Sequence, residues 1–418
     1  MILQPSNHPT ARAQPLNRFA LVNGRIVLPN EIVAGKAVII ENDKILGVTD
    51  AGELASDVDC IDVGGRFITP GLIDIHSHGA LGHTFNEPTA QAFTTITNEN
   101  ARRGVTSMLA TLATAPIPDL VRCFEFCRAW MKKETCDVSK NIASLKGTQI
   151  LGMYLESPYI DPAQKGALDP QNIRMPNDGT ADVLLEHHAV IKIFMLAPEL
   201  DGAIQLTHKL ANLGIIVAAG HSSAKDEQVL AAMRAGLSHV THIWSAMSMV
   251  VREGPWRKPG LLETALTHDG LTVEMIADNK HLPQTLMKLA YKCIGAERLC
   301  AISDATSGAG LPEGARFKMG GLEYDVQDGV GMMLDRSSFA GSSTLVNEMI
   351  PILMNVADIP LAQAIRMLTL TPARVIGVNN RKGSIEAGKD ADIAIFNDDF
   401  TCWRTMIGGE WMYSKDEE

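Results

Sequence analysis

Short apolar runs at both ends of the chain predict β-strands. They cover residues 19–22, 25–28, 37–40 and 45–48 near the start, and 391–396, 401–407 and 411–413 near the end. The pair Asn23-Gly24 separates the first two runs, and Asn-Gly between apolar runs is typical of a β-hairpin. Gly408-Gly409 predicts a similar turn near the end. We therefore expect one small β-sandwich domain formed by both termini.

The middle of the chain alternates between apolar runs and segments with helical periodicity. Eight runs predict strands: 72–75, 105–109, 150–155, 191–196, 215–219, 240–243, 271–276 and 299–302. The segments 120–131, 203–213, 227–235 and 283–293 predict helices. Continuous apolar strands separated by helices indicate a parallel sheet that is buried on both faces.

Eight such units predict an α/β fold, a distorted (β/α)₈ TIM barrel, with a doubly wound open sheet as the competing topology. The expected domains are the sandwich, from residues 1–67 and 376–418, and a catalytic barrel from residues 68–375. The first seventeen residues are expected to be a loose tail without the apolar core of a signal peptide.

Composition narrows the possible partners and location. The net charge of −11 disfavours nucleic acid and anionic membrane surfaces. No apolar run reaches the roughly 20 residues of a membrane span. The seven cysteines are scattered, which argues against a disulfide scaffold or a cysteine zinc site, and Cys123 and Cys127 are expected to be buried apolar residues. We expect a cytoplasmic protein that binds neither nucleic acid nor membrane.

Polar residues follow the predicted barrel strands where the strands end. They are His76, His78, Glu156, His221, His242, His281 and Asp304. Barrel enzymes place their catalytic groups on this face. Residues i and i+2 of an extended chain point to one side, so His76 and His78 can reach one ion. Imidazole and carboxylate are ligands of zinc, iron or manganese, so the pattern predicts a divalent metal site with a carboxylate available for proton transfer.

Each residue alone also has an ordinary structural interpretation. Glu156 or Asp304 could cap a following helix or turn, and a His-x-His pair often makes ordinary hydrogen bonds at a strand end. The coincidence of so many strand ends favours a site. His239 is expected to have no such role, because it precedes His242 by three residues, at the start of the predicted strand and on its opposite face.

Several runs resemble a known family. The run 70–79, Pro-Gly-Leu-Ile-Asp-Ile-His-Ser-His-Gly, resembles the opening signature of the amidohydrolase superfamily, and the run 383–392, Gly-Ser-Ile-Glu-Ala-Gly-Lys-Asp-Ala-Asp, resembles its closing one. More narrowly, the chain resembles the N-acetylglucosamine-6-phosphate deacetylases from about residue 19 to 413. The motifs that carry this likeness are 155–159 (Leu-Glu-Ser-Pro-Tyr), 165–167 (Lys-Gly-Ala), 197–199 (Ala-Pro-Glu), 220–222 (Gly-His-Ser), 241–242 (Thr-His), 246–247 (Ala-Met), 303–305 (Ser-Asp-Ala) and 340–342 (Ala-Gly-Ser).

The resemblance implies a role for each matched residue. Glu156, His221 and His242 match the ligands of the main ion, and His76 and His78 match a pair that can hold a second ion beside Glu156. Asp304 matches the catalytic acid and base, and His281 matches a histidine that contacts the substrate near the scissile amide. Substrate contacts match Ala167, Ser245, Ala246, Phe339, Ala340 and Gly341. The family's phosphate-binding arginine matches Arg257, with Arg252 as its rival; in relatives it can reach a neighbouring subunit, which implies a homodimer.

The implied reaction is metal-dependent removal of acetate from N-acetylglucosamine-6-phosphate, with one or two ions per subunit and zinc preferred over iron or manganese. Several positions depart from the family pattern: Leu168 replaces a histidine, Ser245 an asparagine, and Ser157 and Asn279 each a glycine. The first two bear on the substrate. They support an alternative, a deacetylase of the isomeric N-acetylgalactosamine-6-phosphate or another N-acyl amidohydrolase. A third hypothesis is a metal-binding scaffold without turnover, which retention of the matched ligands and Asp304 disfavours.

Overall fold

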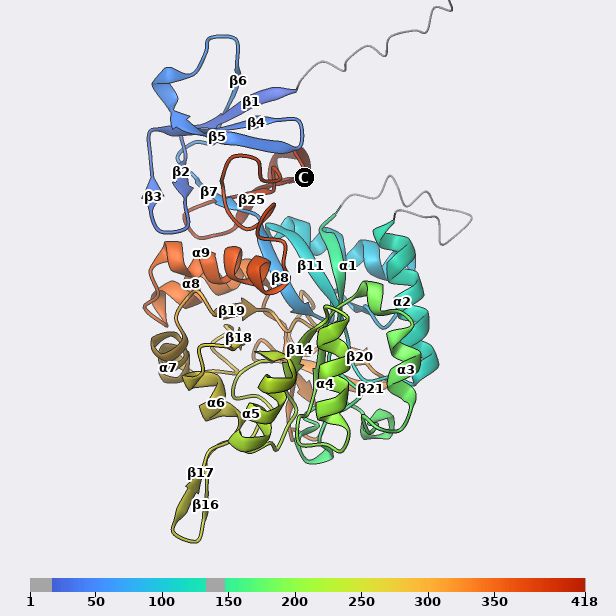
Figure 1. Ribbon diagram of the computed structural model, residues 1–418. Coiled ribbons are helices and arrows are strands. Elements are labelled where there is room, and N and C mark those ends of the chain that lie inside the picture. The colour runs from blue at the N-terminus through green and yellow to red at the C-terminus, as the bar shows by residue number, and fades with distance from the viewer. Residues whose placement is uncertain (1–16, 133–146, 418) are drawn as a thin grey trace, which may run out of the picture.

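The computed structural model describes residues 17–132 and 147–417. The predicted tail, apart from Asn17, and Cys136 lie outside this part of the chain. The small domain at the top of Figure 1 is a sandwich of two sheets built from both ends of the chain. One sheet contains β1 (Arg18–Val22), β4 (Lys36–Glu41), β5 (Lys44–Asp50) and β6 (Asp59–Asp62). The other contains β2 (Arg25–Val27), β3 (Ile32–Val33), β7 (Phe67–Pro70), β24 (Ile393–Phe396), β25 (Cys402–Ile407) and β26 (Glu410–Ser414).

The expected hairpin at Asn23-Gly24 is wrong. Asn23 makes a turn with φ of 57°, but β1 and β2 enter different sheets. β1 pairs with β4 and β6, whereas β2 pairs with β3 and β7. The physical reason is burial: crossing between the layers places Leu21 and Ile26 in one apolar core, which a two-stranded hairpin could not enclose.

The barrel prediction is confirmed, and the open sheet is wrong. Eight parallel strands form one sheet: β8 (Leu72–Ser77), β11 (Val105–Leu112), β12 (Gln149–Leu155), β13 (Ile191–Leu196), β14 (Ile216–Ala219), β15 (Leu237–Val240), β18 (Thr272–Ile276) and β19 (Leu299–Ile302). The edge strands β8 and β19 meet at their C-terminal ends, where Asp304 N donates to His76 O at 2.9 Å and Ser77 bridges to Ala305. Closure at the strand ends, without a full ladder, is the distortion of this barrel.

Ten α-helices surround the barrel in the described residues: α1 (Ala90–Arg102), α2 (Ile117–Met131), α3 (Thr180–Leu185), α4 (Ala203–Asn212), α5 (Asp226–Ala235), α6 (Leu261–Thr267), α7 (Gln284–Ile294), α8 (Val346–Asn355), α9 (Leu361–Met367) and α10 (Leu370–Val375). The four predicted helices correspond to α2, α4, α5 and α7. Cys123 and Cys127 of α2 are buried in the main core, as expected. Nothing in these helices is long and apolar enough to cross a membrane.

Several strand features were not predicted, among them β3, β6, β7 and a short antiparallel pair of β9 (Gly79–Ala80) and β10 (His83–Thr84). β15 begins and ends three residues earlier than expected, because Gly236, with φ of 119°, ends α5 directly before it. A hairpin of β16 (Val251–Glu253) and β17 (Trp256–Lys258) projects from the barrel (Figure 1). After β19, an antiparallel sheet forms from β20 (Arg316–Met319), β21 (Leu322–Gln327), β22 (Val330–Met333) and β23 (Phe339–Ser342). The last strand of this sheet contacts Asp304: Ser342 N donates to the backbone carbonyl oxygen of Asp304 at 2.8 Å.

Candidate active site

The C-terminal ends of the barrel strands surround a pocket of about 480 Å³. Glu156 follows β12, His221 follows β14, and Asp304 follows β19 by two residues. His242 follows β15 by two residues, and His76 lies inside β8 rather than after it. The predicted residues that line this pocket are His78, Glu156, Ala167, His221, His242, Ser245, Ala246, His281, Asp304, Phe339, Ala340 and Gly341. His76 is fully buried behind them.

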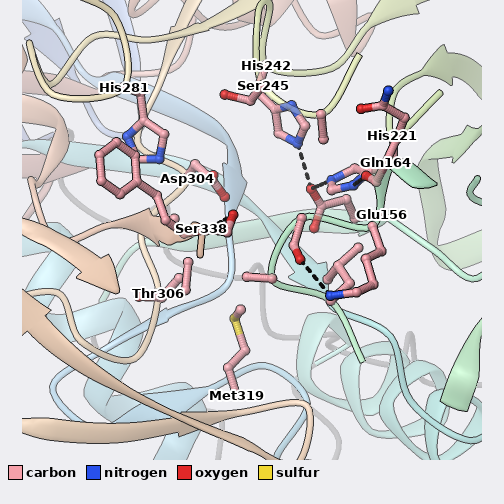
Figure 2. Close-up of a pocket in the computed structure, with 18 of the residues that line it drawn as sticks. Glu156, Gln164, His221, His242, Ser245, His281, Asp304, Thr306, Met319 and Ser338 are labelled. Carbon is pink, nitrogen blue, oxygen red and sulfur yellow. Dashed lines mark hydrogen bonds and ion pairs between the residues drawn. The ribbon is translucent and has the colours of Figure 1, made fainter. Parts of the chain in front are cut away.

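One group of potential metal ligands consists of Glu156, His221 and His242, all buried. Glu156 Oε1 lies 3.3 Å from His221 Nε2 and 2.9 Å from His242 Nε2, and Figure 2 shows the three side chains converging. His221 Nδ1 lies 2.7 Å from the carbonyl oxygen of Gln164, which can only accept, so this nitrogen carries the hydrogen. In a neutral His221 ring, Nε2 therefore turns a lone pair toward the carboxylate. A cation between this nitrogen and the carboxylate oxygen would satisfy both.

The second group consists of His76, His78 and Asp304, also buried. His78 Nε2 lies 3.4 Å from Asp304 Oδ1 and 3.1 Å from Glu156 Oε2. His76 Nε2 lies 3.5 Å from both carboxylates and has no hydrogen-bond partner among the described residues. Glu156 thus stands between the two groups: its Oε1 faces His221, His242 and His76, and its Oε2 faces His78.

The electrostatics of the cluster favour cations. Burial alone would raise the pKa of Glu156, but the positive charge of His78 beside it holds that pKa well below its usual value. Burial likewise opposes ionisation of Asp304, and the hydrogen bond with His78 lowers the pKa of that carboxyl. Burial lowers the pKa of His78, but the charge of Glu156 outweighs it and raises that pKa to about 9. Two ionised carboxylates beside four imidazoles are the donor set that a divalent cation takes.

Around this cluster, polar and apolar walls complete the pocket. His281 Nδ1 lies 2.7 Å from Asp278 Oδ2, and its ring packs edge-on to Phe339 with centroids 5.0 Å apart. Gly341 has a φ of 62°, and a Cβ there would lie 2.5 Å from the carbonyl oxygen of Asp304, so a larger residue would displace the Asp304 backbone. Leu168 belongs to the apolar wall.

Arg257 and Arg252 are not brought to the pocket of their own chain. They are paired residues of the β16–β17 hairpin, and both are exposed. Sequence reasoning also missed Lys165 as a pocket residue. It is the one lysine or arginine among the described residues that line the pocket, and its Nζ contacts the carbonyl oxygen of Gly166 at 3.1 Å.

Sequence reasoning also missed Glu274, a fully buried carboxylate inside β18 that contacts His76. His239 lies inside β15 rather than at its start, and its Nε2 lies 3.0 Å from Glu274 Oε1. His239 lies outside both ligand groups of the described residues. A glutamate within an apolar strand run was the available signal, since a buried charge needs partners.

Comparison with known proteins agrees with this geometry. The model of the Amidohydrolase family matches residues 67–412, and the model of the NagA composite domain matches residues 18–68. The chain therefore belongs to the amidohydrolase family and is a hydrolytic enzyme.

The particular relatives are more specific. The chain is 32% identical to N-acetylglucosamine-6-phosphate deacetylase of Haemophilus influenzae over 94% of its own length and 99% of the relative's. It is 30% identical to N-acetylgalactosamine-6-phosphate deacetylase of Escherichia coli O157:H7, covering 82% and 87%. A crystal structure of N-acetylglucosamine-6-phosphate deacetylase from Pasteurella multocida superposes with a TM-score of 0.86 at 28% identity, covering 94% and 99%. A Mycobacterium smegmatis mutant enzyme in complex with N-acetyl-D-glucosamine-6-phosphate has a TM-score of 0.86 at 26% identity, covering 95% and 100%. The resemblance to the N-acetylglucosamine-6-phosphate deacetylases is thus confirmed.

Proposed function

We propose that this enzyme hydrolyses the acetamide of N-acetylglucosamine-6-phosphate to glucosamine-6-phosphate and acetate. One observation carries the proposal: both ligand groups, the second of which includes Asp304, meet at the pocket that His281 also lines. The deacetylases that the chain matches over nearly its whole length support the substrate.

The donor set fits a divalent ion. Glu156, His221 and His242 would hold the first ion, and His76 and His78, beside Glu156, a second. His76 Nε2 supports this assignment: it has no hydrogen-bond partner in the described part of the chain, and a metal ion would satisfy its buried lone pair. Zinc suits a site of histidines and carboxylates, with iron or manganese as alternatives. A bound ion would polarise the acetyl carbonyl and lower the pKa of a water from 15.7 to about 7.

Asp304 would act as the general base and then the general acid. Its pKa is lowered, so the carboxylate is ionised and can accept the proton of the attacking water. As the bond between the carbonyl carbon and the nitrogen breaks, Asp304 would return this proton to the leaving amine. The products are then acetate and the free amino sugar phosphate.

His281 would stabilise the negative charge that develops on the carbonyl oxygen. The carboxylate of Asp278 accepts the Nδ1 hydrogen and so fixes the ring orientation. In the imidazolium form, Nε2 presents the other hydrogen, and a positioned donor of this kind stabilises an oxyanion.

Two cations could meet the phosphate. Lys165 lines the pocket of its own chain, whereas Arg257 lies on the projecting hairpin. A guanidinium matches phosphate oxygens with its planar fork, so we retain Arg257 as the preferred residue, delivered by a second subunit of a homodimer. Lys165 would then supply a point charge from the same chain. The homodimer and a cytoplasmic location remain predictions.

A second candidate substrate is N-acetylgalactosamine-6-phosphate. Leu168 and Ser245 support it, since both line the pocket and depart from the usual residues there. A relative of similar identity carries that activity in its name. Ala167, Ala246, Phe339 and Ala340 would contact either sugar and do not separate the two.

The test is acetate release by the metal-loaded enzyme from both sugar phosphates, with bound metal measured on the same sample. We expect higher kcat/KM for the glucosamine compound and bound ion in the active sample. An identically purified Asp304→Asn variant controls for contaminating deacetylase. A higher kcat/KM for the galactosamine compound would favour the second candidate. No release from either by metal-loaded protein would reject both.

A further inference from the structure

A buried carboxylate behind the pocket, Glu274, connects the two ligand groups. Its Oε2 lies 2.9 Å from His76 Nδ1 and 3.2 Å from the backbone nitrogen of His242. Its Oε1 lies 3.0 Å from His239 Nε2, and His239 Nδ1 in turn lies 2.7 Å from Thr272 Oγ1. One side chain therefore contacts a histidine from each group and a third histidine that supports it from behind.

The contact with Glu274 determines which nitrogen of His76 carries the proton. An ionised carboxylate only accepts hydrogen bonds, so Nδ1 of His76 must be the donor. Nε2 of the neutral ring then keeps its lone pair, and this atom lies 3.5 Å from both Glu156 Oε1 and Asp304 Oδ1. Glu274 thus turns the lone pair of His76 toward the space between the two carboxylates.

Glu274 also supports an unfavourable backbone conformation at His242. The φ of His242 is 21°, a region that residues with a side chain rarely adopt. The next amide, Ile243 N, donates to the backbone carbonyl of Glu274 at 2.8 Å. The backbone amides of His242 and Ile243, which are consecutive in this turn, therefore both donate hydrogen bonds to Glu274. The turn places His242 Nε2 2.9 Å from Glu156 Oε1.

We infer that Glu274 is a positioning residue for both ion-binding groups. The charge of Glu274 sets the proton position and basicity of His76. Its side-chain and backbone oxygens accept the hydrogen bonds that stabilise the turn at His242. Partners of this kind, which orient a metal-binding histidine through its other nitrogen, typically change metal affinity 10–100-fold when mutated. The inference rests on the metal site proposed above and adds a residue that would touch neither ion nor substrate.

The experiment is titration of the metal-free protein with Co²⁺, followed by visible absorption and by bound ion per chain. Wild-type protein should bind two ions. Glu274→Gln keeps an acceptor for His76 and for the His242 amide but loses the charge, so the first ion should bind normally and the second 10–100-fold more weakly. Glu274→Ala removes both supports and should weaken both ions. Once the His76 ring of the metal-free protein carries a single hydrogen, ring ¹⁵N shifts should show that hydrogen on Nδ1.

The matched control is Glu99→Gln. It removes another buried carboxylate, which lies in α1 and pairs with Arg103 just after that helix, and it should leave both affinities unchanged. Wild-type affinities in both Glu274 variants would overturn the inference, and so would a singly protonated His76 ring with its hydrogen on Nε2. If Glu274→Ala does not fold, the Glu274→Gln result alone decides the role of the charge. Uptake of one ion by wild-type protein would also overturn that role. A wild-type protein that binds no Co²⁺ would instead overturn the metal site itself.

Discussion

Replacing Asp304 with asparagine tests the proton-transfer role most directly. Asp304 has a φ of 46°, and asparagine tolerates this left-handed region better than most residues with a side chain. The backbone nitrogen of Asp304 donates to His76 O, and its carbonyl oxygen accepts from Ser342 N. Neither hydrogen bond involves the side chain, so both would persist in the variant. Asp304→Asn is therefore expected to keep the fold and to change the chemistry of one oxygen.

The expected loss follows from that chemistry. An amide cannot accept the water proton, and general acid–base catalysis typically contributes 10²–10⁴-fold. At about 1.36 kcal/mol per tenfold, this corresponds to about 3–5 kcal/mol of the barrier. The second ligand group, of His76, His78 and Asp304, loses its carboxylate. The first group, of Glu156, His221 and His242, keeps all three of its potential metal ligands. The first ion should therefore stay bound while kcat falls by at least 100-fold.

The assay is acetate release at saturating substrate, with bound metal and Tm measured on the same preparation. The matched control is Asp269→Asn, which removes the charge of an exposed aspartate paired with Arg298 and should keep wild-type kcat. A kcat for Asp304→Asn within tenfold of wild type would refute the role in proton transfer. If the first ion were lost together with activity, the fall in kcat would reflect the metal site and the reasoning above would be wrong.

Three further predictions concern ion binding, phosphate recognition and pH. His242→Ala should strip most of the first ion, because it removes one of three donors; metal analysis that shows unchanged content would count against the assignment. Arg257→Ala should raise KM for the phosphorylated sugar far more than for its dephosphorylated analogue, and Lys165→Met should do so to a smaller extent; equal effects on both substrates would exclude phosphate contact. Burial opposes ionisation of Asp278, but the hydrogen bonds of this carboxyl with His281 lower its pKa in the folded protein. The ionised carboxylate therefore stabilises the folded protein above the unfolded pKa of about 3.9. That stabilisation is lost as the pH falls through the lowered pKa of the folded state. Asp278→Asn should therefore flatten the acid side of a plot of unfolding free energy against pH, and an unchanged slope would contradict this account.

The elements of the barrel could be predicted because their signals are local. A buried parallel strand needs a continuous apolar run, and all eight runs became strands of one sheet. The candidate ligands could be found for the same reason, since parallel strands bring their C-terminal ends to one face. Strand limits were less certain, as the three-residue displacement of β15 shows, because an apolar run does not mark where a strand stops.

Pairing between distant segments could not be read in this way. Asn23-Gly24 indicated a turn correctly, but the sheet that each flanking strand joins depended on cores formed with β4 and β7. The β20–β23 sheet and the outward position of Arg257 on the β16–β17 hairpin likewise depend on how these inserted segments pack against the rest of the chain. Local sequence specifies a turn, whereas burial of the whole domain decides its partners.

The sequence of this protein was sufficient to predict the barrel, the sandwich built from both termini and the candidate residues that meet at one pocket. The orientation of those residues depends on contacts that form only in the folded protein. Glu274 and His76 are separated by 198 positions in the chain yet lie 2.9 Å apart. The position of a proton on an imidazole depends on such a contact, because a buried carboxylate must find donors and a histidine has two nitrogens to offer. A linear pattern can supply the ligand types, but the direction of each lone pair is set by the packed interior.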